Sequence, residues 1–150
     1  MSEARVVIVG GGQAGGRVAL SLREGGHAGP LTIVAAEPWA PYERPPLSKD
    51  LLTGEWEPAR LALVPEEALA AQGIALRKGV AAVAIDPDRR LLRLADGEDL
   101  PWDALVLATG ARPRLLEVAP GAPRLQPLRE LADARALREA LRPGARLAIL

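Results

Sequence analysis

The stretch that decides the fold is Val6-Val7-Ile8-Val9-Gly10-Gly11-Gly12-Gln13-Ala14-Gly15. Four apolar residues run directly into the motif G-x-G-x-x-G, whose glycines are Gly10, Gly12 and Gly15. A short continuous run of β-branched residues is typical of a buried parallel strand. The sequence therefore predicts a strand over residues 2–9, a tight glycine turn, and a helix over residues 13–25 that Gly25-Gly26 brings to an end.

The three glycines of this motif have separate roles in such a turn. One permits the turn itself, one lets the backbone approach a pyrophosphate, and one lets the helix pack on the strand. The N-terminus of the helix presents N–H groups and its positive dipole end to phosphates. A second predicted strand, residues 31–34, is followed by Glu37, 22 residues after Gly15, where an acid can bind ribose hydroxyls. We therefore predict a dinucleotide site, the alternative being glycines that only make a turn. The motif does not distinguish NAD from FAD.

The composition excludes several classes of protein. The chain has 150 residues, which suits one domain or part of a larger protein, and 49% of them are hydrophobic. The net charge is zero, so we expect no nucleic-acid or membrane partner. The chain has no cysteine, which excludes disulfides, thiolate metal sites and a C-x-x-C redox pair, and we predict no metal site. Neither a signal peptide nor an apolar run of membrane-spanning length is present, and we predict a cytoplasmic protein.

The segment after Glu37 is unlike the helix that usually follows in a Rossmann unit. Residues 38–50 read PWAPYERPPLSKD, and their prolines and aromatic residues favour a stiff, extended segment. Ser48 begins a short helix through Leu52, which Gly54 closes. Two interpretations are open. The segment could deliver Arg44 and Lys49 to the glycine motif, or it could be a surface loop whose charges are solvated.

The middle of the chain predicts a helix over residues 65–73 and strands over residues 74–77, 80–85 and 91–95. The short turns between these strands favour an antiparallel meander, inserted after the second βα unit in place of a plain crossover. A buried strand follows Trp102 and ends in Ala108-Thr109-Gly110. Because ligands of open α/β sheets sit at the carboxyl ends of the strands, we expect these small residues to face the same crevice as Gly10 to Gly15. The alternative is a plain exit from strand to loop.

The end of the chain repeats its beginning. After a predicted helix over residues 130–141, Arg146-Leu147-Ala148-Ile149-Leu150 copies the pattern of Arg5-Val6-Val7-Ile8-Val9. We expect from this that the chain is the N-terminal part of a longer protein whose second dinucleotide-binding unit starts near Ala145. The alternative is a self-contained domain whose last strand joins the first sheet.

Four stretches carry a resemblance to a known family. They are residues 6–16, the segment Pro41-Tyr42-Glu43-Arg44-Pro45-Pro46-Leu47-Ser48-Lys49, residues 105–114, and Leu128-Arg129 with Asp133-Ala134. The sequence resembles the FAD-dependent pyridine-nucleotide oxidoreductases. It is most similar to the ferredoxin reductases that serve Rieske-type oxygenases and bacterial P450 systems, and to the rubredoxin reductases. The string R-P-P-L-S-K is the stretch most specific to this branch.

The resemblance implies an α/β fold with three parts. Residues 1–112 would form a Rossmann-like FAD-binding domain with a parallel sheet and an antiparallel β-meander insertion. Residues 113–142 would be a connecting loop and helix. Residues 143–150 would be the first strand of a truncated NAD(P)H-binding domain, so that the 150-residue chain alone is expected to be inactive.

The resemblance also implies roles for individual residues. Backbone N–H groups of the glycine motif would hold the FAD pyrophosphate, and Glu37 would bind the adenosine ribose, although some relatives carry the acid one residue earlier. The backbone of Ala82 would contact the adenine, and Thr109 and Gly110 would pass close to the adenine half and the pyrophosphate. Arg44, Pro45 and Lys49 would lie along the flavin, and Arg129 would reach the cofactor from the connecting segment. The residues implied for the pyrophosphate and the ribose are Gly10, Gly12, Ala14, Gly15 and Glu37.

In this family NAD(P)H would deliver a hydride to FAD, and single electrons would pass to a ferredoxin or rubredoxin. Relatives that reduce disulfides carry a cysteine pair, where this chain has Leu47-Ser48-Lys49-Asp50. The resemblance assigns no certain catalytic residue, and Lys49 would tune the flavin. Three alternatives are another flavin enzyme on this scaffold (an NADH oxidase, a nitrite-reductase module or an apoptosis-inducing-factor-like protein), a nucleotide-binding module without activity, and an NAD-binding domain without flavin.

Overall fold

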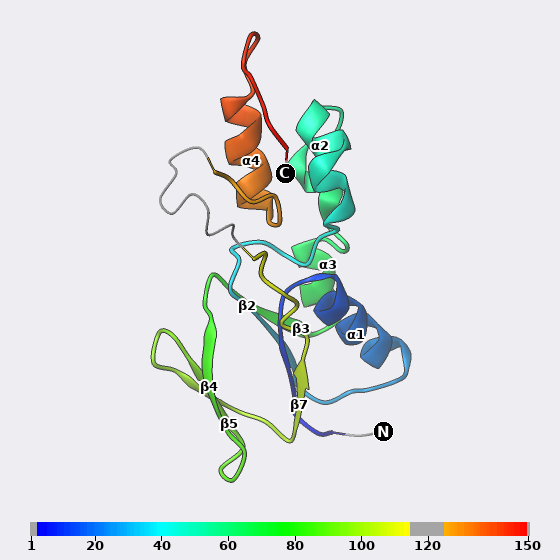
Figure 1. Cartoon of the computed structure of the whole chain (residues 1–150). Helices are drawn as coiled ribbons and strands as arrows, with labels where there is room; N and C mark the ends of the chain where they lie inside the picture. The colour runs from blue at the N-terminus through cyan, green and yellow to red at the C-terminus, as the bar shows by residue number, and fades with distance from the viewer. Residues whose placement is uncertain (1–2, 115–124, 150) are drawn as a thin grey trace. The chain divides into compact units, whose positions relative to one another are not determined.

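The computed structural model describes residues 3–114 and 125–149 of the chain (Figure 1). It divides into two compact units, one formed by Met1–Tyr42 with Ala62–Gly110, the other by Glu43–Leu61 with Ala111–Leu150. The strands that the described residues form all lie in the first unit, and the described part of the second unit contains helices.

A four-stranded parallel sheet forms the centre of the first unit. Its strands are β1 (Val6–Val9), β2 (Leu31–Ala35), β3 (Ile74–Lys78) and β7 (Ala104–Leu107), in the order β3-β2-β1-β7. Strand β1 lies between β2 and β7, with Ile8 opposite both Ile33 and Val106. All four residues of β1 are buried, as expected for a strand covered on both faces.

Two helices cover one face of this sheet. They are α1 (Gln13–Glu24) and α3 (Glu66–Ala71). Side chains from the sheet and the helices share one buried cluster, in which Ile8, Ile33 and Ala19 have no exposed surface. Helix α1 contributes Ala19 to this cluster and α3 contributes Leu69. Burial of these apolar residues, at about 25 cal/mol per Å² removed from water, holds the two helices on the sheet.

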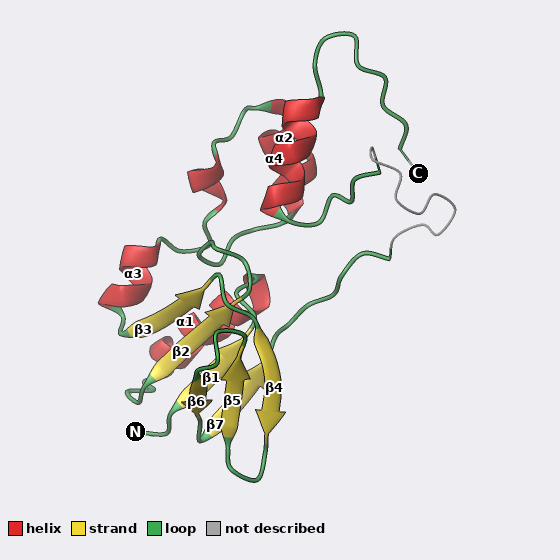
Figure 2. Cartoon of the chain, turned by 90° about the vertical axis from the view of Figure 1, so that its left-hand side faces the viewer, coloured by secondary structure: helices red, strands yellow, loops and turns green. Residues whose placement is uncertain are grey.

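An antiparallel sheet covers the other face. Its strands are β4 (Ala82–Asp86), β5 (Leu91–Leu94) and β6 (Asp99–Pro101), in the order β4-β5-β6, and Figure 2 shows them in front of the parallel strands. Leu92 and Leu94 of β5 pack with Val7, Val9 and Val34 in a second buried cluster. The alternation along β1 therefore serves both layers, because Val6 and Ile8 face the helices while Val7 and Val9 face the antiparallel sheet.

The structure confirms the α/β class and corrects the predicted meander. We expected residues 74–77 to start an antiparallel meander, but they form β3, which pairs in parallel with β2 along Leu31↔Ile74 to Ala35↔Lys78. The short helix α3 lies between these two strands and so makes a parallel crossover. The antiparallel sheet starts only after Gly79 and takes its third strand from residues 99–101.

One arginine ties several loops of the first unit together. Arg23, in the last turn of α1, donates from Nη1 to the carbonyl oxygens of His27 (2.6 Å) and Gly29 (2.9 Å). It also donates from Nε to Gln72 O (2.9 Å) and from Nη2 to Gly73 O (2.8 Å), just after α3. The guanidinium thereby supplies hydrogen bonds to carbonyl groups that follow α1 and α3. Its positive charge is also favourable near the C-terminus of a helix, where the helix dipole is negative.

The second unit is made of short helices that pack around a few apolar side chains. It contains the 3-10 helices η1 (Pro45–Ser48) and η2 (Pro58–Leu61) and the α-helices α2 (Asp50–Thr53) and α4 (Leu131–Ala140). Helix α2 packs beside α4 (Figure 2). The predicted helix after Ser48 is confirmed as α2, which the 3-10 helix η1 precedes. Gly54, at a φ of 85°, ends it as predicted. A capping box of Glu130 and Asp133 begins α4.

The predicted last strand is not formed. Residues 145–149 have no strand and pair with neither sheet, and Leu150 lies outside the described residues. A strand requires a neighbour with which to exchange backbone hydrogen bonds, and no described segment supplies one here. The sequence pattern alone thus does not define a strand, and the assignment of residues 143–150 to a second domain stays a prediction.

No helix within residues 3–114 and 125–149 combines the length and the apolar character needed to cross a membrane.

Replacing Arg23 by Met should destabilise the protein by about 2–3 kcal/mol in total, because four carbonyl groups lose a charged donor but can bond water instead, which offsets most of the loss. This corresponds to a fall of roughly 4–12 °C in melting temperature for a chain of this size. Arg17→Met is the matched control, because Arg17 lies on the same helix and is exposed. Equal melting temperatures of the two variants would contradict the role of Arg23.

Candidate functional site

The glycine motif lies at the carboxyl end of the central strand, where the parallel strands of the first unit end together. Gly10 N donates to Val34 O at the end of β2 (2.9 Å), and Ala108 N donates to Val9 O (2.8 Å). These bonds continue the pairing of β1 beyond its last residue on both sides. The predicted convergence of Ala108-Thr109-Gly110 with the glycine motif is therefore confirmed at Gly10 and Ala108.

Gly10 can only be glycine for two independent reasons. Its φ is +124°, a conformation that residues with a side chain rarely adopt. A Cβ atom built on it would lie 2.1 Å from Ala108 O, inside the backbone of the neighbouring strand. The turn after β1 can therefore pass over the end of β7 only without a side chain.

Two more glycines of this loop, Gly15 and Gly11, pack against protein. A Cβ on Gly15 would lie 1.9 Å from Gly10 O, so the first turn of α1 rests on the turn that precedes it. A Cβ on Gly11 would lie 2.3 Å from the Cβ of Ala35 at the end of β2. Gly15 thus has the predicted role of close helix packing, and Gly11, which the motif does not specify, is required by the neighbouring strand.

Gly12 differs from these three. It is the N-cap residue of α1, and a Cβ atom built on it would meet no protein atom within 4 Å. Its φ of −86° is open to any residue, so neither packing nor backbone conformation requires glycine there. The first turn of α1 contains no acidic residue and has no side-chain cap. The first N–H groups of a helix have no acceptor within the helix and lie at the positive end of its dipole, and beside them the space at Gly12 is open.

Glu37 follows β2 at the same edge of the sheet. Its carbonyl oxygen accepts a hydrogen bond from Gly79 N (3.0 Å), just after β3, and Val80 N donates to Ala35 O (3.1 Å). Its carboxylate accepts a hydrogen bond from the hydroxyl of Tyr42, with 2.6 Å between the two oxygens. The sequence predicted Glu37 at this position, but gave no role to Tyr42 or Gly79.

The remaining predicted residues of the first unit lie near strand ends. Ala82 is the first residue of β4 and is paired with Leu94. Thr109 and Gly110 follow β7, and Gly110 has a φ of +70°. Ala14 is an exposed residue in the first turn of α1. Their roles toward a cofactor stay predictions.

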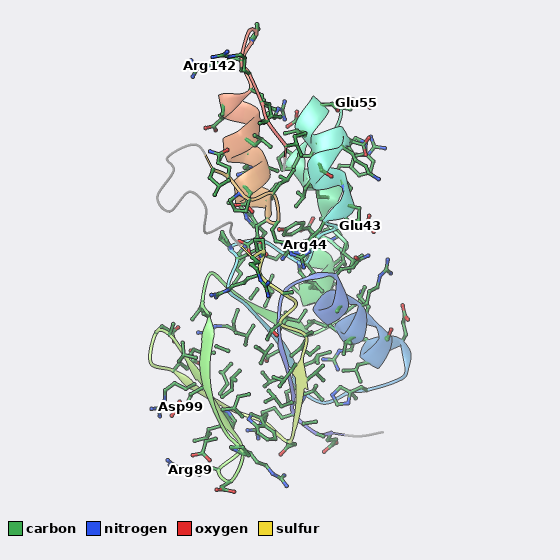
Figure 3. The ribbon with its side chains drawn as sticks, viewed as in Figure 1. Glu43, Arg44, Glu55, Arg89, Asp99 and Arg142 are labelled. Atoms are coloured by element: carbon green, nitrogen blue, oxygen red, sulfur yellow. The ribbon has the colours of Figure 1, made fainter. Side chains whose placement is uncertain are left out.

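The second unit holds the other four predicted residues, and two of them are in contact. Arg44, which precedes η1 (Figure 3), donates from Nη1 to Arg129 O, 2.6 Å away. Arg129 N in turn donates to the Asp133 carboxylate (2.9 Å), which also caps α4. The backbone of Arg129 is therefore fixed on both sides of its side chain. Pro45 begins η1 and Lys49 follows it, and both are exposed.

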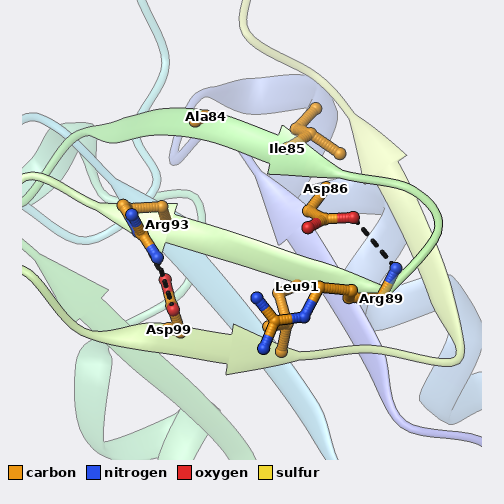
Figure 4. Close-up of a pocket in the computed structure, with 7 residues that line it drawn as sticks. All are labelled: Ala84, Ile85, Asp86, Arg89, Leu91, Arg93 and Asp99. Atoms are coloured by element: carbon orange, nitrogen blue, oxygen red, sulfur yellow. Dashed lines mark hydrogen bonds and ion pairs between the residues drawn. The ribbon is translucent and has the colours of Figure 1, made fainter.

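A hollow of about 300 Å³ lies elsewhere, on the antiparallel sheet (Figure 4). It is lined by Arg93 of β5 and Asp99 of β6, which form two hydrogen bonds of 2.8 Å, and by Asp86, which accepts from Arg89 N (2.9 Å). The hydrogen bonds from Arg93 lower the pKa of the Asp99 carboxyl below its usual value. Arg93 and Asp99 therefore compensate each other's charge at the wall of this hollow.

The comparison with known proteins agrees with this architecture. The family model of the pyridine nucleotide-disulphide oxidoreductases matches residues 4–150. The chain belongs to this family. The predicted resemblance is thereby confirmed.

Several relatives of this pyridine nucleotide-disulphide oxidoreductase chain are ferredoxin reductases. Putidaredoxin reductase CamA from Pseudomonas putida is 43% identical over 149 residues, covering 97% of this chain and 35% of that protein. The ferredoxin–NAD(+) reductase component of the p-cumate 2,3-dioxygenase system, also from Pseudomonas putida, is 43% identical over 147 residues, covering 97% and 36%.

The fold is also shared with solved structures. A chain in the crystal structure of the covalent putidaredoxin reductase–putidaredoxin complex superposes with a TM-score of 0.88 and 43% identity, covering 93% of this chain and 34% of that one. The chain thus spans about a third of the length of the relatives it matches, at 35% and 36% of the two reductases from Pseudomonas putida.

Gly10→Ala should destabilise the protein by at least about 3 kcal/mol, because it combines a disfavoured φ with a clash against backbone. Gly12→Ala, the matched control, should leave the melting temperature within about 2 °C of the wild type, since its Cβ meets nothing. Thermal unfolding followed by circular dichroism distinguishes the two. A Gly10→Ala protein as stable as Gly12→Ala would contradict the packing described for Gly10.

Proposed function

We propose that this chain is the FAD-binding part of an NAD(P)H-dependent ferredoxin or rubredoxin reductase. The observation that carries the proposal is Gly12, which faces open space at the uncapped, acid-free N-terminus of α1. A glycine that its own protein does not require is explained by a ligand that must approach the backbone closely. The pyrophosphate of a dinucleotide has the charge and size for that position.

The residues of the first unit fit the adenosine diphosphate half of FAD. Backbone N–H groups of the glycine loop and the first turn of α1 would hold the pyrophosphate. Glu37 would accept hydrogen bonds from the adenosine ribose, and the backbone of Ala82 would contact the adenine. The residues we assign here are Gly10, Gly12, Ala14, Gly15, Glu37, Ala82, Thr109 and Gly110.

The second unit would serve the flavin half. Arg44, Pro45 and Lys49 would lie along the flavin, and Arg129 would reach the cofactor from the start of α4. Support comes from the fixed backbone of Arg129, which Arg44 and Asp133 hold on its two sides. A side chain that extends from a fixed backbone loses less entropy when it binds a ligand.

When bound, FAD would supply the chemistry of this family, which is acceptance of a hydride from NAD(P)H, transfer of its two electrons one at a time, and release of the proton to solvent. The protein would orient the cofactor and set its potential. The chain has no cysteine, so it offers no disulfide as an intermediate electron carrier. We therefore assign an iron–sulfur protein or rubredoxin as the electron acceptor, consistent with the names of the relatives.

The domain assignment is also part of this proposal. We assign residues 1–112 to the FAD-binding domain, residues 113–142 to a connection, and residues 143–150 to the start of an NAD(P)H-binding domain. A cytoplasmic location stays a prediction.

The first experiment is a visible absorption spectrum of the protein expressed from its complete reading frame, followed by anaerobic addition of NADH or NADPH. We expect a yellow protein that bleaches with one of them. Gly12→Ala should fold normally and lose at least about tenfold in FAD affinity, because its methyl group occupies the approach to the pyrophosphate. A folded, colourless wild type that takes up no FAD would refute the flavin assignment, and a yellow protein that no pyridine nucleotide bleaches would favour a nucleotide-binding module.

Lys49→Met should lower the midpoint potential of the bound flavin by about 30 mV, which is about 1.4 kcal/mol for a two-electron couple. The reason is that a nearby ammonium group stabilises the negative charge gained on reduction. Lys78→Met is the matched control, because Lys78 is the only other lysine of the chain and pairs with Glu66. Identical potentials for wild type and Lys49→Met would refute the role of Lys49.

A further inference from the structure

The hydroxyl of Tyr42 is bonded to the acid that we assign to the ribose. The 2.6 Å separation between Tyr42 Oη and Glu37 Oε2 is that of a charge-assisted O–H···O⁻ hydrogen bond, which is about twice as strong as a neutral one. Both residues belong to the first unit, five positions apart on the segment that follows β2. The bond therefore closes this segment on itself.

The two partners differ in their exposure. Tyr42 is only 4% exposed, whereas Glu37 is half-buried and remains accessible at the edge of the sheet. A carboxylate has about four acceptor positions, and the bond from Tyr42 occupies one of them. Such an arrangement orients the Glu37 carboxylate from the side of the buried phenol.

The backbone on either side of Tyr42 is held by packing of its neighbour Pro41 on helix α1 and by pairing with residues 62 and 63. Pro41 is fully buried, and a Cβ on Gly16 of α1 would lie 2.7 Å from the Cβ of Pro41. Leu63 N donates to Pro41 O (2.9 Å), and Tyr42 forms an antiparallel bridge with Ala62. The backbone that carries Tyr42 is thus held against helix α1 through Pro41, and the Tyr42 hydroxyl in turn bonds the Glu37 carboxylate.

We propose that Tyr42 is a positioning residue that fixes the Glu37 carboxylate for the hydroxyl groups of the adenosine ribose. The proposal rests on the FAD-binding function proposed above. Tyr42 does not contact the cofactor in this account. Its hydroxyl removes rotational freedom from the Glu37 side chain before the ligand arrives, which lowers the entropy cost of binding.

The consequence is measurable as selectivity for the ribose hydroxyls. A hydrogen bond from a hydroxyl to a carboxylate is worth enough to give about a tenfold preference for FAD over an analogue that lacks the hydroxyl. The wild type should show this preference over the 2′-deoxyadenosine or the 3′-deoxyadenosine form of FAD. Glu37→Gln should reduce it to less than about threefold, and Tyr42→Phe should do the same.

The experiment titrates the apoprotein of each variant with FAD and with both deoxy analogues, using flavin fluorescence. Thr32→Val is the matched control, because it removes a hydroxyl from strand β2 without touching Glu37, and it should keep the full preference. In the double variant Glu37→Gln/Tyr42→Phe, the preference should be no lower than in Glu37→Gln alone, because the two residues act through one contact.

The outcomes separate this inference from the proposed function. A wild type that binds no FAD refutes the proposed function. A wild type that binds FAD with no preference over either analogue overturns only the inference, as does a Tyr42→Phe protein that keeps the tenfold preference. A Tyr42→Phe protein that melts lower but keeps the preference assigns the hydroxyl to stability and also overturns it.

A second measurement tests the hydrogen bond first in the wild-type protein. Tyr42 is the single tyrosine of this chain, and a hydroxyl proton shared with a carboxylate exchanges slowly and resonates downfield in proton NMR. We expect such a resonance in the wild type, and expect it to move upfield in Glu37→Gln. Its absence from the wild type would overturn the proposal.

Discussion

The rest of the first unit depends on the close approach of Gly10 to the end of β7. A built Cβ at Gly10 would lie 2.1 Å from Ala108 O, so the chain can turn from β1 into α1 only without a side chain there. Because β1 pairs with both β2 and β7, this one turn sets where three strands end. In the same turn, Gly15 packs on Gly10, while the position of Gly12 between them is open.

The same helix then organises the segment that the glycine motif does not describe. Pro41 packs against Gly16, and the Tyr42 hydroxyl donates a hydrogen bond to Glu37. Arg23 at the other end of α1 bonds the carbonyl groups that follow α1 and α3. Both ends of one helix therefore hold loops in place, and at its first turn Pro41 packs on Gly16, on the segment that also carries Glu37. Preorganisation of this kind favours ligand affinity.

Sequence patterns predicted the elements well where the signal was local. The apolar run into G-x-G-x-x-G gave β1 and α1, and Glu37 was found by its distance from Gly15. Residues 74–77 were assigned to the wrong sheet, because an apolar strand reads alike whether its neighbour runs parallel or antiparallel. Residues 145–149 copy the pattern of β1 without forming a strand, since a pattern cannot supply a pairing partner.

The sequence by itself determined the glycine turn, the acid after the second strand, and membership of the pyridine nucleotide-disulphide oxidoreductase family. Those features depend on residue type and short spacing, which the chain carries locally. Only the tertiary structure decided which glycines are required by packing and which one faces open space. Only it joined Tyr42 to Glu37 and Arg44 to the backbone of Arg129, because side-chain contacts depend on how the folded backbone turns, and that is set by packing across the whole unit.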